Sequence, residues 1–236
     1  MSDRLKDRVA LVTGASRGIG AATAKALAAA GAHVILTGRT VPDLEAVESS
    51  IFEAGGSATI APLDLTEANS VARLGVAISG RWPSLDILVL NAAMLGPMMP
   101  VPQVSGEELA KVFTLNVLAQ QALIAAFDPL LRKSDAGRLV AISSGVARNP
   151  KAYCGPYSAS KAALEALVLS YGDEVQNLAP LKVAIVNPGP TRTAMRADAY
   201  PGEDPATVKS PDVVGEAIVE LLNSDFETGH RLQLAR

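Results

Sequence analysis

Short apolar runs, rich in β-branched residues, alternate in this chain with longer stretches rich in alanine and leucine. This alternation restricts the fold more than any other feature. The short runs predict strands over 8–12, 33–37, 58–63, 86–90, 138–143 and 181–186, with a weak last strand near 232–234. The longer stretches predict helices over 18–30, 43–54, 67–79, 106–131, 156–178 and 211–222.

Strands that alternate with helices form βαβ units, and their right-handed crossovers give a parallel sheet covered on both faces. The sequence therefore predicts an α/β fold, a doubly wound parallel sheet of the Rossmann type, as a single domain over 1–236. The hydrophobic share of 49% allows one large core. In such sheets ligands bind at the carboxyl ends of the strands, near the point where the strand order reverses.

Composition argues against several other classes of protein. The formal net charge is −3 without a basic run, so we expect no nucleic-acid or membrane partner. The first seven residues lack the apolar core of a signal peptide, and we expect no apolar stretch of the roughly 20 residues that span a bilayer. The single cysteine, Cys154, favours a cytoplasmic location. His33 and His230 stand apart from other ligand types, so we expect no metal site.

A glycine-rich segment, T-G-A-S-R-G-I-G over 13–20, joins the first strand to the first helix. Glycines let the backbone approach a pyrophosphate, and the free N–H groups at a helix start bind its charge. The spacing differs from the general G-x-G-x-x-G pattern, and an ordinary strand-to-helix turn is the alternative. The cofactor contacts expected here come from Gly14, Ser16, Arg17, Gly18, Ile19 and Gly20.

The second strand ends at Gly38-Arg39 without the acidic residue that would bind an adenosine 2′-hydroxyl. Arg39 and Arg17 could both contact a 2′-phosphate, which favours NADP(H) over NAD(H). NAD stays the alternative, since Arg39 would also suit a solvated loop. Asp64 and Leu65 end the third strand beside the expected adenine position, although Asp64 would equally suit a helix cap. Asn91, Ala92 and Ala93 end the fourth strand, where small residues leave room for the cofactor.

Tyr157 and Lys161 are spaced to share one face of a predicted helix. A free tyrosine has a pKa of about 10, and we expect the lysine charge and an oxidised nicotinamide to lower it. Tyr157 would then protonate a carbonyl oxygen in reduction or take the alcohol proton in oxidation. Ser144, at the end of the fifth strand, could bind the substrate oxygen. Asn116, polar within an apolar stretch, could hold a water that links Lys161 to solvent.

Taken together, these segments resemble the short-chain dehydrogenase/reductases over essentially the whole chain: the glycine loop, Asn91-Ala-Ala, Asn116, Ser144, Tyr157-x-x-x-Lys161 and Asn187-Pro-Gly189. The resemblance implies a catalytic triad of Ser144, Tyr157 and Lys161, extended by Asn116, with Lys161 also on the nicotinamide ribose. It places Pro188, Gly189, Thr191 and Thr193 at the nicotinamide. Ala93 stands where the family has glycine, and the run from Pro188 to Arg196 resembles bacterial reductases of unassigned substrate.

The resemblance further implies a homodimer or homotetramer in which the helices over 106–131 and 156–178 pair across a two-fold axis. The expected activity is hydride transfer between NADP(H) and a small-molecule carbonyl or secondary alcohol. Methionines in the loops after the fourth and sixth strands favour an apolar substrate. The segment over 191–209 would suit a mobile lid. An NADP(H)-binding regulator with little turnover is the alternative, and an epimerase or dehydratase is disfavoured by the chain's length.

Overall fold

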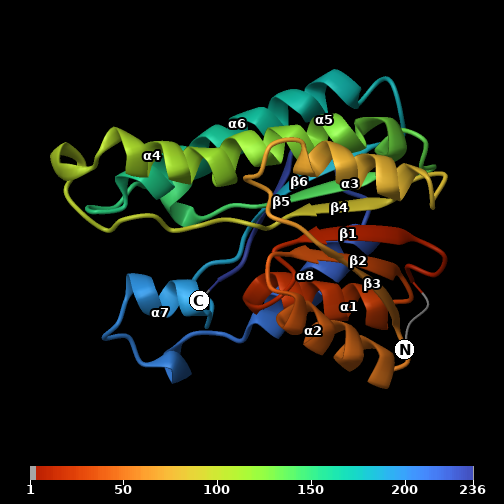
Figure 1. Ribbon diagram of the computed structural model, residues 1–236, viewed down its shortest axis with the longest axis horizontal. Coiled ribbons are helices and arrows are strands. Elements are labelled where there is room, and N and C mark those ends of the chain that lie inside the picture. Colours follow the sequence, from red (N-terminus) through yellow and green to blue (C-terminus); the bar gives the residue numbers. More distant parts are fainter. Residues whose placement is uncertain (1–3, 236) are drawn as a thin grey trace.

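Every apolar run identified in the sequence becomes a strand in the computed structural model, which describes residues 4–235 (Figure 1). The strands are β1 (Val9–Thr13), β2 (His33–Gly38), β3 (Ser57–Pro62), β4 (Ile87–Leu90), β5 (Arg138–Ile142), β6 (Lys182–Asn187) and β7 (His230–Gln233). Within the described residues they form one parallel sheet in the order β3-β2-β1-β4-β5-β6-β7. This confirms the α/β doubly wound fold. The expected domain also included 1–3 and 236, which lie outside the described residues.

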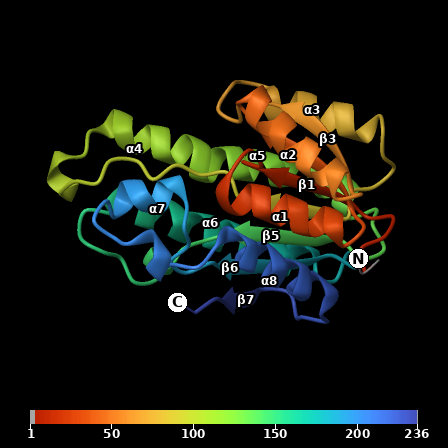
Figure 2. The ribbon, with the colours of Figure 1, turned by 90° about the horizontal axis from the view of Figure 1, so that it is seen from below.

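Helices cover both faces of this sheet (Figure 1). They are α1 (Gly18–Ala29), α2 (Val41–Glu53), α3 (Ser70–Ser79), α4 (Gly106–Phe113), α5 (Ala119–Leu131), α6 (Gly155–Val175), α7 (Ala194–Ala199) and α8 (Pro211–Asn223). Helices α1, α2 and α8 lie on one face, with α1 and α8 side by side (Figure 2). Helices α3, α5 and α6 lie on the other. The strand order reverses between β1 and β4, so the loops after these two strands border the expected ligand site.

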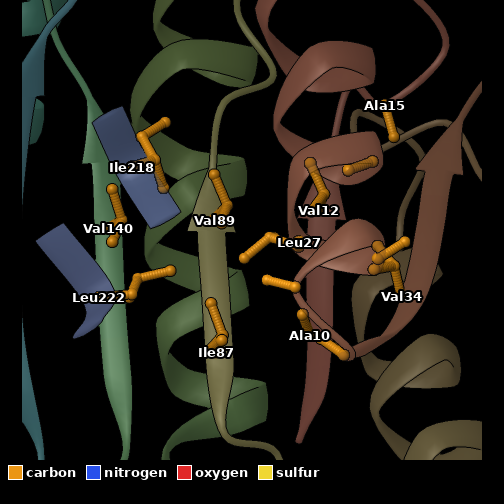
Figure 3. Close-up of a cluster of buried hydrophobic side chains, with 14 of the residues drawn as sticks. Ala10, Val12, Ala15, Leu27, Val34, Ile87, Val89, Val140, Ile218 and Leu222 are labelled. Atoms are coloured by element: carbon orange, nitrogen blue, oxygen red, sulfur yellow. The ribbon is translucent and has the colours of Figure 1, made fainter. Parts of the chain in front are cut away.

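The two faces of the sheet divide the core into two apolar clusters. Successive side chains of a strand point to opposite faces, so in β1 Val12 joins one cluster and Leu11 the other. Figure 3 shows the first cluster, where strand side chains such as Val12 and Val89 meet Leu27 of α1 and Ile218 of α8. Burial on both faces explains why the central strands, such as β1 and β4, are apolar at nearly every position, in contrast to the edge strands β3 and β7.

The predicted continuous helix over 106–131 is wrong at its centre. A π-helical turn, η2 (Thr114–Leu118), separates α4 from α5 and contains Asn116. The side chain of Asn116 bonds both backbone groups of Met94, and such inserted turns often occur at functional sites. The long loop after β6 also contains a short helix, α7, which the sequence analysis did not predict.

The helical segment Gly106–Leu131 is long and apolar enough to cross a membrane, by length and composition alone. The expectation that the chain contains no such stretch is therefore wrong by this criterion. A core helix passes the same test, and 39% of the most apolar window of this segment is buried. Its inward side chains, Leu123, Phe127 and Leu131 among them, lie within the second core cluster against the sheet.

Candidate active site

The glycine loop between β1 and α1 is tightly closed against its surroundings. Gly14 has a φ of +64°, which an L side chain rarely adopts. A Cβ atom on Gly20 would lie 2.8 Å from the carbonyl carbon of Gly14 and closer still to its oxygen. The Ala15 amide donates to the Thr37 carbonyl oxygen at 3.0 Å, which ties the loop to the end of β2. The loop therefore leaves backbone, not side chains, at the start of α1.

Asn91 supports this loop from the end of β4. Its Nδ2 donates to the carbonyl oxygens of Thr13 at 2.8 Å and Gly14 at 3.2 Å. The Thr13 hydroxyl in turn accepts the amides of Asn91 at 2.9 Å and Ala92 at 3.0 Å. The expectation for Asn91, Ala92 and Ala93 was room for a cofactor. The contacts show in addition that Asn91 braces the glycine loop.

Two arginines, Arg17 within the loop and Arg39 after β2, were expected to contact a 2′-phosphate. Arg17 precedes α1 and Arg39 follows β2, and both side chains are exposed. A Cβ atom on Gly38 would lie 3.6 Å from the Ser16 hydroxyl, so the glycine loop and the end of β2 are adjacent. Within the described part of the chain, neither arginine has an ion-pair partner within 4 Å.

Asp64, expected at the adenine or as a cap, has one carboxylate oxygen engaged in a turn. Its Oδ1 accepts the Thr66 amide at 2.8 Å and the Thr66 hydroxyl at 2.7 Å. These hydrogen bonds, with a smaller contribution from the Arg39 charge, lower the pKa of Asp64. Asp64 therefore caps a turn and not a helix, because the next helix, α3, begins at Ser70 with Asn69 as its N-cap. Leu65 follows it, partly buried against the second core cluster.

Tyr157 lies in the first turn of α6, and Ser144 follows β5. Burial raises the pKa of Tyr157 to about 12, and the hydrogen bond from the Ser144 hydroxyl opposes that shift. The phenol is therefore protonated near neutral pH. Lys161 was expected to lower this pKa. It makes no such contribution here, because its Nζ lies 5.8 Å from the ring centroid and bonds elsewhere.

Lys161 is almost fully buried, with 2% of its surface exposed. Its Nζ donates to the carbonyl oxygen of Ile142, which is the last residue of β5, at 2.7 Å. Burial lowers the pKa of Lys161 to about 8, and the negative charge of Glu165 acts in the opposite direction. A buried amine with a pKa this close to neutrality is typical of functional sites.

Asn116 is fully buried in the π-helical turn and joins two elements of the site. Its Oδ1 accepts the Met94 amide at 2.8 Å, and its Nδ2 donates to the Met94 carbonyl oxygen at 2.9 Å. The same Nδ2 donates at 3.0 Å to the hydroxyl of Ser160, which donates to the Tyr157 carbonyl oxygen at 2.8 Å. Asn116 therefore connects the loop after β4 to the helix turn that carries Tyr157. Its predicted role in a water relay stays a prediction.

The loop after β6 meets the glycine loop from the opposite side. A Cβ atom on Gly18 would lie 3.3 Å from the methyl group of Thr193, which caps α7 by accepting the Arg196 amide at 3.1 Å. Pro188 is buried, and Gly189 accepts a hydrogen bond from the Thr191 hydroxyl at 3.2 Å. The glycine loop, expected at the pyrophosphate, and Thr193, expected at the nicotinamide, thus come together in space.

Sequence reasoning missed several polar side chains that hold these groups. Thr13 braces the loop as described, and Gln120 donates to the Ala92 carbonyl oxygen at 2.9 Å. The carboxylate of Glu165 accepts a hydrogen bond at 2.6 Å from the hydroxyl of Ser143, the residue that precedes Ser144. A usable signal existed, because Gln120 lies one helical turn after Asn116 and Glu165 one turn after Lys161.

The described residues contain no group of three or more histidine, cysteine, aspartate or glutamate side chains that could hold a metal ion.

A parallel sheet with a glycine loop at its switch point, and a Ser–Tyr–Lys group at the carboxyl ends of the next strands, defines a dinucleotide-dependent enzyme site. The family model for short chain dehydrogenases matches residues 8–204. The chain therefore belongs to the short-chain dehydrogenase/reductase family of oxidoreductases.

Curated and solved relatives cover nearly the whole chain. The uncharacterized oxidoreductase YciK of Escherichia coli K12 is 41% identical over 226 residues, which are 94% of this chain and 89% of that protein. A short chain dehydrogenase of Shigella flexneri, solved with NADP, has a TM-score of 0.94 and 40% identity, and the match covers 99% of both chains. One from Escherichia coli CFT073, solved with NADPH, has a TM-score of 0.93 and 40% identity, with 98% of both chains covered.

Proposed function

We propose that this protein is an NADP(H)-dependent oxidoreductase that acts on a carbonyl or secondary alcohol, with Tyr157 as the general acid and base. The observation that carries the proposal is the group formed by Ser144, Tyr157 and Lys161, in which a protonated phenol meets a buried amine. An NADP(H)-binding regulator is the alternative. A regulator has no use for a buried, pKa-shifted acid–base pair, so the enzyme is favoured.

The residues at the switch point fit NADP(H). The glycine loop presents backbone amides at the start of α1, where pyrophosphate oxygens would be bound. Arg17 and Arg39, which form no ion pair with any described residue, would supply positive charge to a 2′-phosphate. Thr193, whose methyl group would lie 3.3 Å from a Cβ atom on Gly18, would hold the nicotinamide amide. The two relatives solved with NADP and NADPH support the same choice.

When bound, NADPH supplies the hydride for the substrate carbon. Ser144 holds the substrate oxygen and donates a hydrogen bond to it. Tyr157, protonated at neutral pH, donates its proton to that oxygen as negative charge develops there. The hydrogen bond from Ser144 stabilises the phenolate that this transfer leaves behind, and protonated Lys161 would hold the nicotinamide ribose, as the family resemblance implies. In the oxidising direction the same groups act in reverse order.

The cofactor choice is tested by fluorescence titration of the purified protein with NADPH and NADH in parallel. We expect NADPH to bind more tightly. In the double variant Arg17→Ala, Arg39→Ala, NADPH affinity should fall about tenfold or more while NADH affinity changes little. Equal losses for both cofactors would remove the assignment of these arginines.

The catalytic role is tested with Tyr157→Phe and a panel of apolar ketones and aldehydes with NADPH. We expect turnover to fall by at least about a thousandfold while NADPH binding persists. Tyr153→Phe, at an exposed tyrosine nearby in the sequence, is the matched control and should keep its activity. Turnover that survives in Tyr157→Phe would contradict the mechanism.

We further propose a homodimer or homotetramer in the cytoplasm. Exposed apolar side chains on the outer side of η2 and α5, such as Leu118 at 62% exposure, would pair with a second copy. Light scattering of the purified protein should give twice or four times the chain mass of 24.4 kDa. A stable monomer would contradict the assembly, and a membrane fraction in cell lysates would contradict the location.

A further inference from the structure

A buried carboxylate lies one helical turn behind Lys161. Glu165 of α6 has 7% of its surface exposed and carries a charge that burial alone would disfavour. Its Oε1 accepts the Ser143 hydroxyl at 2.6 Å. Ser143 directly precedes Ser144, and its amide donates to the Val186 carbonyl oxygen at 2.8 Å. One carboxylate therefore contacts the strand end that positions Ser144 and faces Lys161 along the helix.

Two arginines approach the other oxygen of the same carboxylate. Arg231 of β7 donates to Oε2 through Nη1, and Arg148, in the loop after β5, has its Nε 3.5 Å from Oε2. Burial pushes the pKa of Glu165 upward, but the hydrogen bonds from Ser143 and Arg231, together with the charges of Arg231 and Arg148, outweigh it and hold the pKa below its usual value. Glu165 is therefore ionised at neutral pH.

The charged groups around Lys161 are few. From its own helix it faces Tyr157 and Glu165, and its Nζ donates to the Ile142 carbonyl oxygen at the end of β5. Burial lowers the pKa of Lys161 to about 8. Among the described residues, only the negative charge of Glu165 raises this pKa. Arg148 and Arg231 in turn act on Glu165, whose charge both partly neutralise.

We propose that Glu165 is a positioning residue that keeps Lys161 protonated in its buried site, and that Arg231 of the last strand limits how much of the Glu165 charge acts on Lys161. The inference rests on the proposed function, in which Lys161 acts as a cation. It links β7, at the far edge of the sheet, to the catalytic lysine through one carboxylate.

The arrangement predicts shifts of opposite sign for two substitutions. Glu165→Gln removes the negative charge but keeps the shape and one acceptor oxygen, so Lys161 should lose its proton at lower pH. Arg231→Gln leaves Glu165 charged but less neutralised, so Lys161 should keep its proton to higher pH. A purely structural role for the cluster would give no such opposition, because both substitutions would then loosen the same contacts.

The direct test is an NMR titration of the lysine side chains in the whole protein labelled with ¹³C and ¹⁵N lysine. The chain has eight lysines, and Lys161→Met assigns the Lys161 signal. We expect a midpoint near pH 8 in the wild type, lower by about one pH unit in Glu165→Gln and higher in Arg231→Gln. Glu174→Gln, an exposed glutamate on the same helix, is the matched control and should leave the midpoint unchanged.

An unchanged midpoint, or shifts of the same sign in both variants, would overturn the inference. If Glu165→Gln fails to fold, the upward shift in Arg231→Gln still decides the question. The titration needs no substrate, so its outcome is separate from that of the proposed function, which Tyr157→Phe tests. With a reducible substrate, the alkaline limb of kcat/KM should move in the same two directions, and Glu165→Asp should restore part of the wild-type profile.

Discussion

The two halves of the sheet build their parts of the site from different materials. On the β1–β3 side, the glycine loop presents backbone groups, and the side chains beside it, Arg17 and Arg39, are exposed. On the β4–β7 side, the site consists of polar side chains inside the protein, and Asn116, Lys161 and Glu165 are all less than 8% exposed. The first half resembles a binding surface, and the second a polar core.

This difference has an energetic cause. A dinucleotide phosphate needs close approach and oriented amides, which a tight loop supplies without burying any charge. Proton transfer needs groups whose pKa values lie away from those in water, and burial is what shifts them. The first half should therefore be sensitive to added volume, and the second to lost charge or lost hydrogen bonds.

The largest effect on cofactor binding is expected for Gly20→Ala. The new Cβ would overlap the Gly14 carbonyl group, so the loop must shift and lose its fit to pyrophosphate. NADPH affinity should fall by more than about a hundredfold in fluorescence titration. Gly106→Ala is the matched control, because a Cβ there meets no atom within 4 Å. Unchanged NADPH binding in Gly20→Ala would contradict the contrast between the two halves, because the backbone of the glycine loop would then not bind the pyrophosphate.

Lys161→Met should stabilise the protein while it removes activity. Burial costs the charged lysine free energy, because its pKa is about 8 in the folded chain against 10.5 when solvated. The unfolded chain therefore binds more protons between these values, and wild-type stability rises there with pH. Below pH 8 the variant should be more stable by roughly 2 to 3 kcal/mol, and the gap should close towards pH 10.5.

Chemical denaturation of the wild type and Lys161→Met at pH 7 and pH 10 measures this gap. Lys151→Met changes an exposed lysine and controls for the loss of a surface charge. A gap that stays constant over this pH range would show that Lys161 is not strained by its burial, and that the two halves differ less than the contacts indicate.

Asn116→Ala should destabilise the protein by about 2 kcal/mol, because it leaves the amide and carbonyl of Met94 without their partner. Urea denaturation measures the loss, and Asn149→Ala, at an exposed asparagine, is the control. The kcat should also fall, since the turn that carries Tyr157 loses its link to the loop after β4. If the variant keeps wild-type stability and kcat, the hydrogen bonds from the π-helical turn are not needed to hold the site together.

The smallest effect is expected for Asp64→Ala. Removal of the turn contacts with Thr66 should cost about 1 kcal/mol of stability and leave NADPH affinity within about twofold of the wild type. Thermal unfolding and the same fluorescence titration measure both quantities. Weaker NADPH binding at unchanged stability would instead indicate that the Asp64 side chain contacts the adenine of the cofactor.

Most of the fold followed from hydrophobic periodicity. All seven strands were predicted. Central strands such as β4, buried on both faces, read as short apolar runs, whereas the edge strand β7 is polar and partly exposed and gave only a weak signal. The interruption of 106–131 was missed. A π-helical turn changes the backbone by one residue, which leaves the spacing of apolar residues almost the same as in a continuous helix. The capped helix α7 was missed because it is short and lies in a polar loop.

The sequence by itself determined the elements whose chemistry is local: the glycine loop, the Tyr157–Lys161 spacing on one helix, and the strands that end beside them. Tertiary structure alone decided the electrostatics. It buries Lys161 on the Ile142 carbonyl oxygen, raises the pKa of Tyr157 to about 12, and brings Arg231 from the last strand to Glu165. The reason is physical, since a pKa depends on burial and on charges that are distant in sequence, and neither is written in residue spacing.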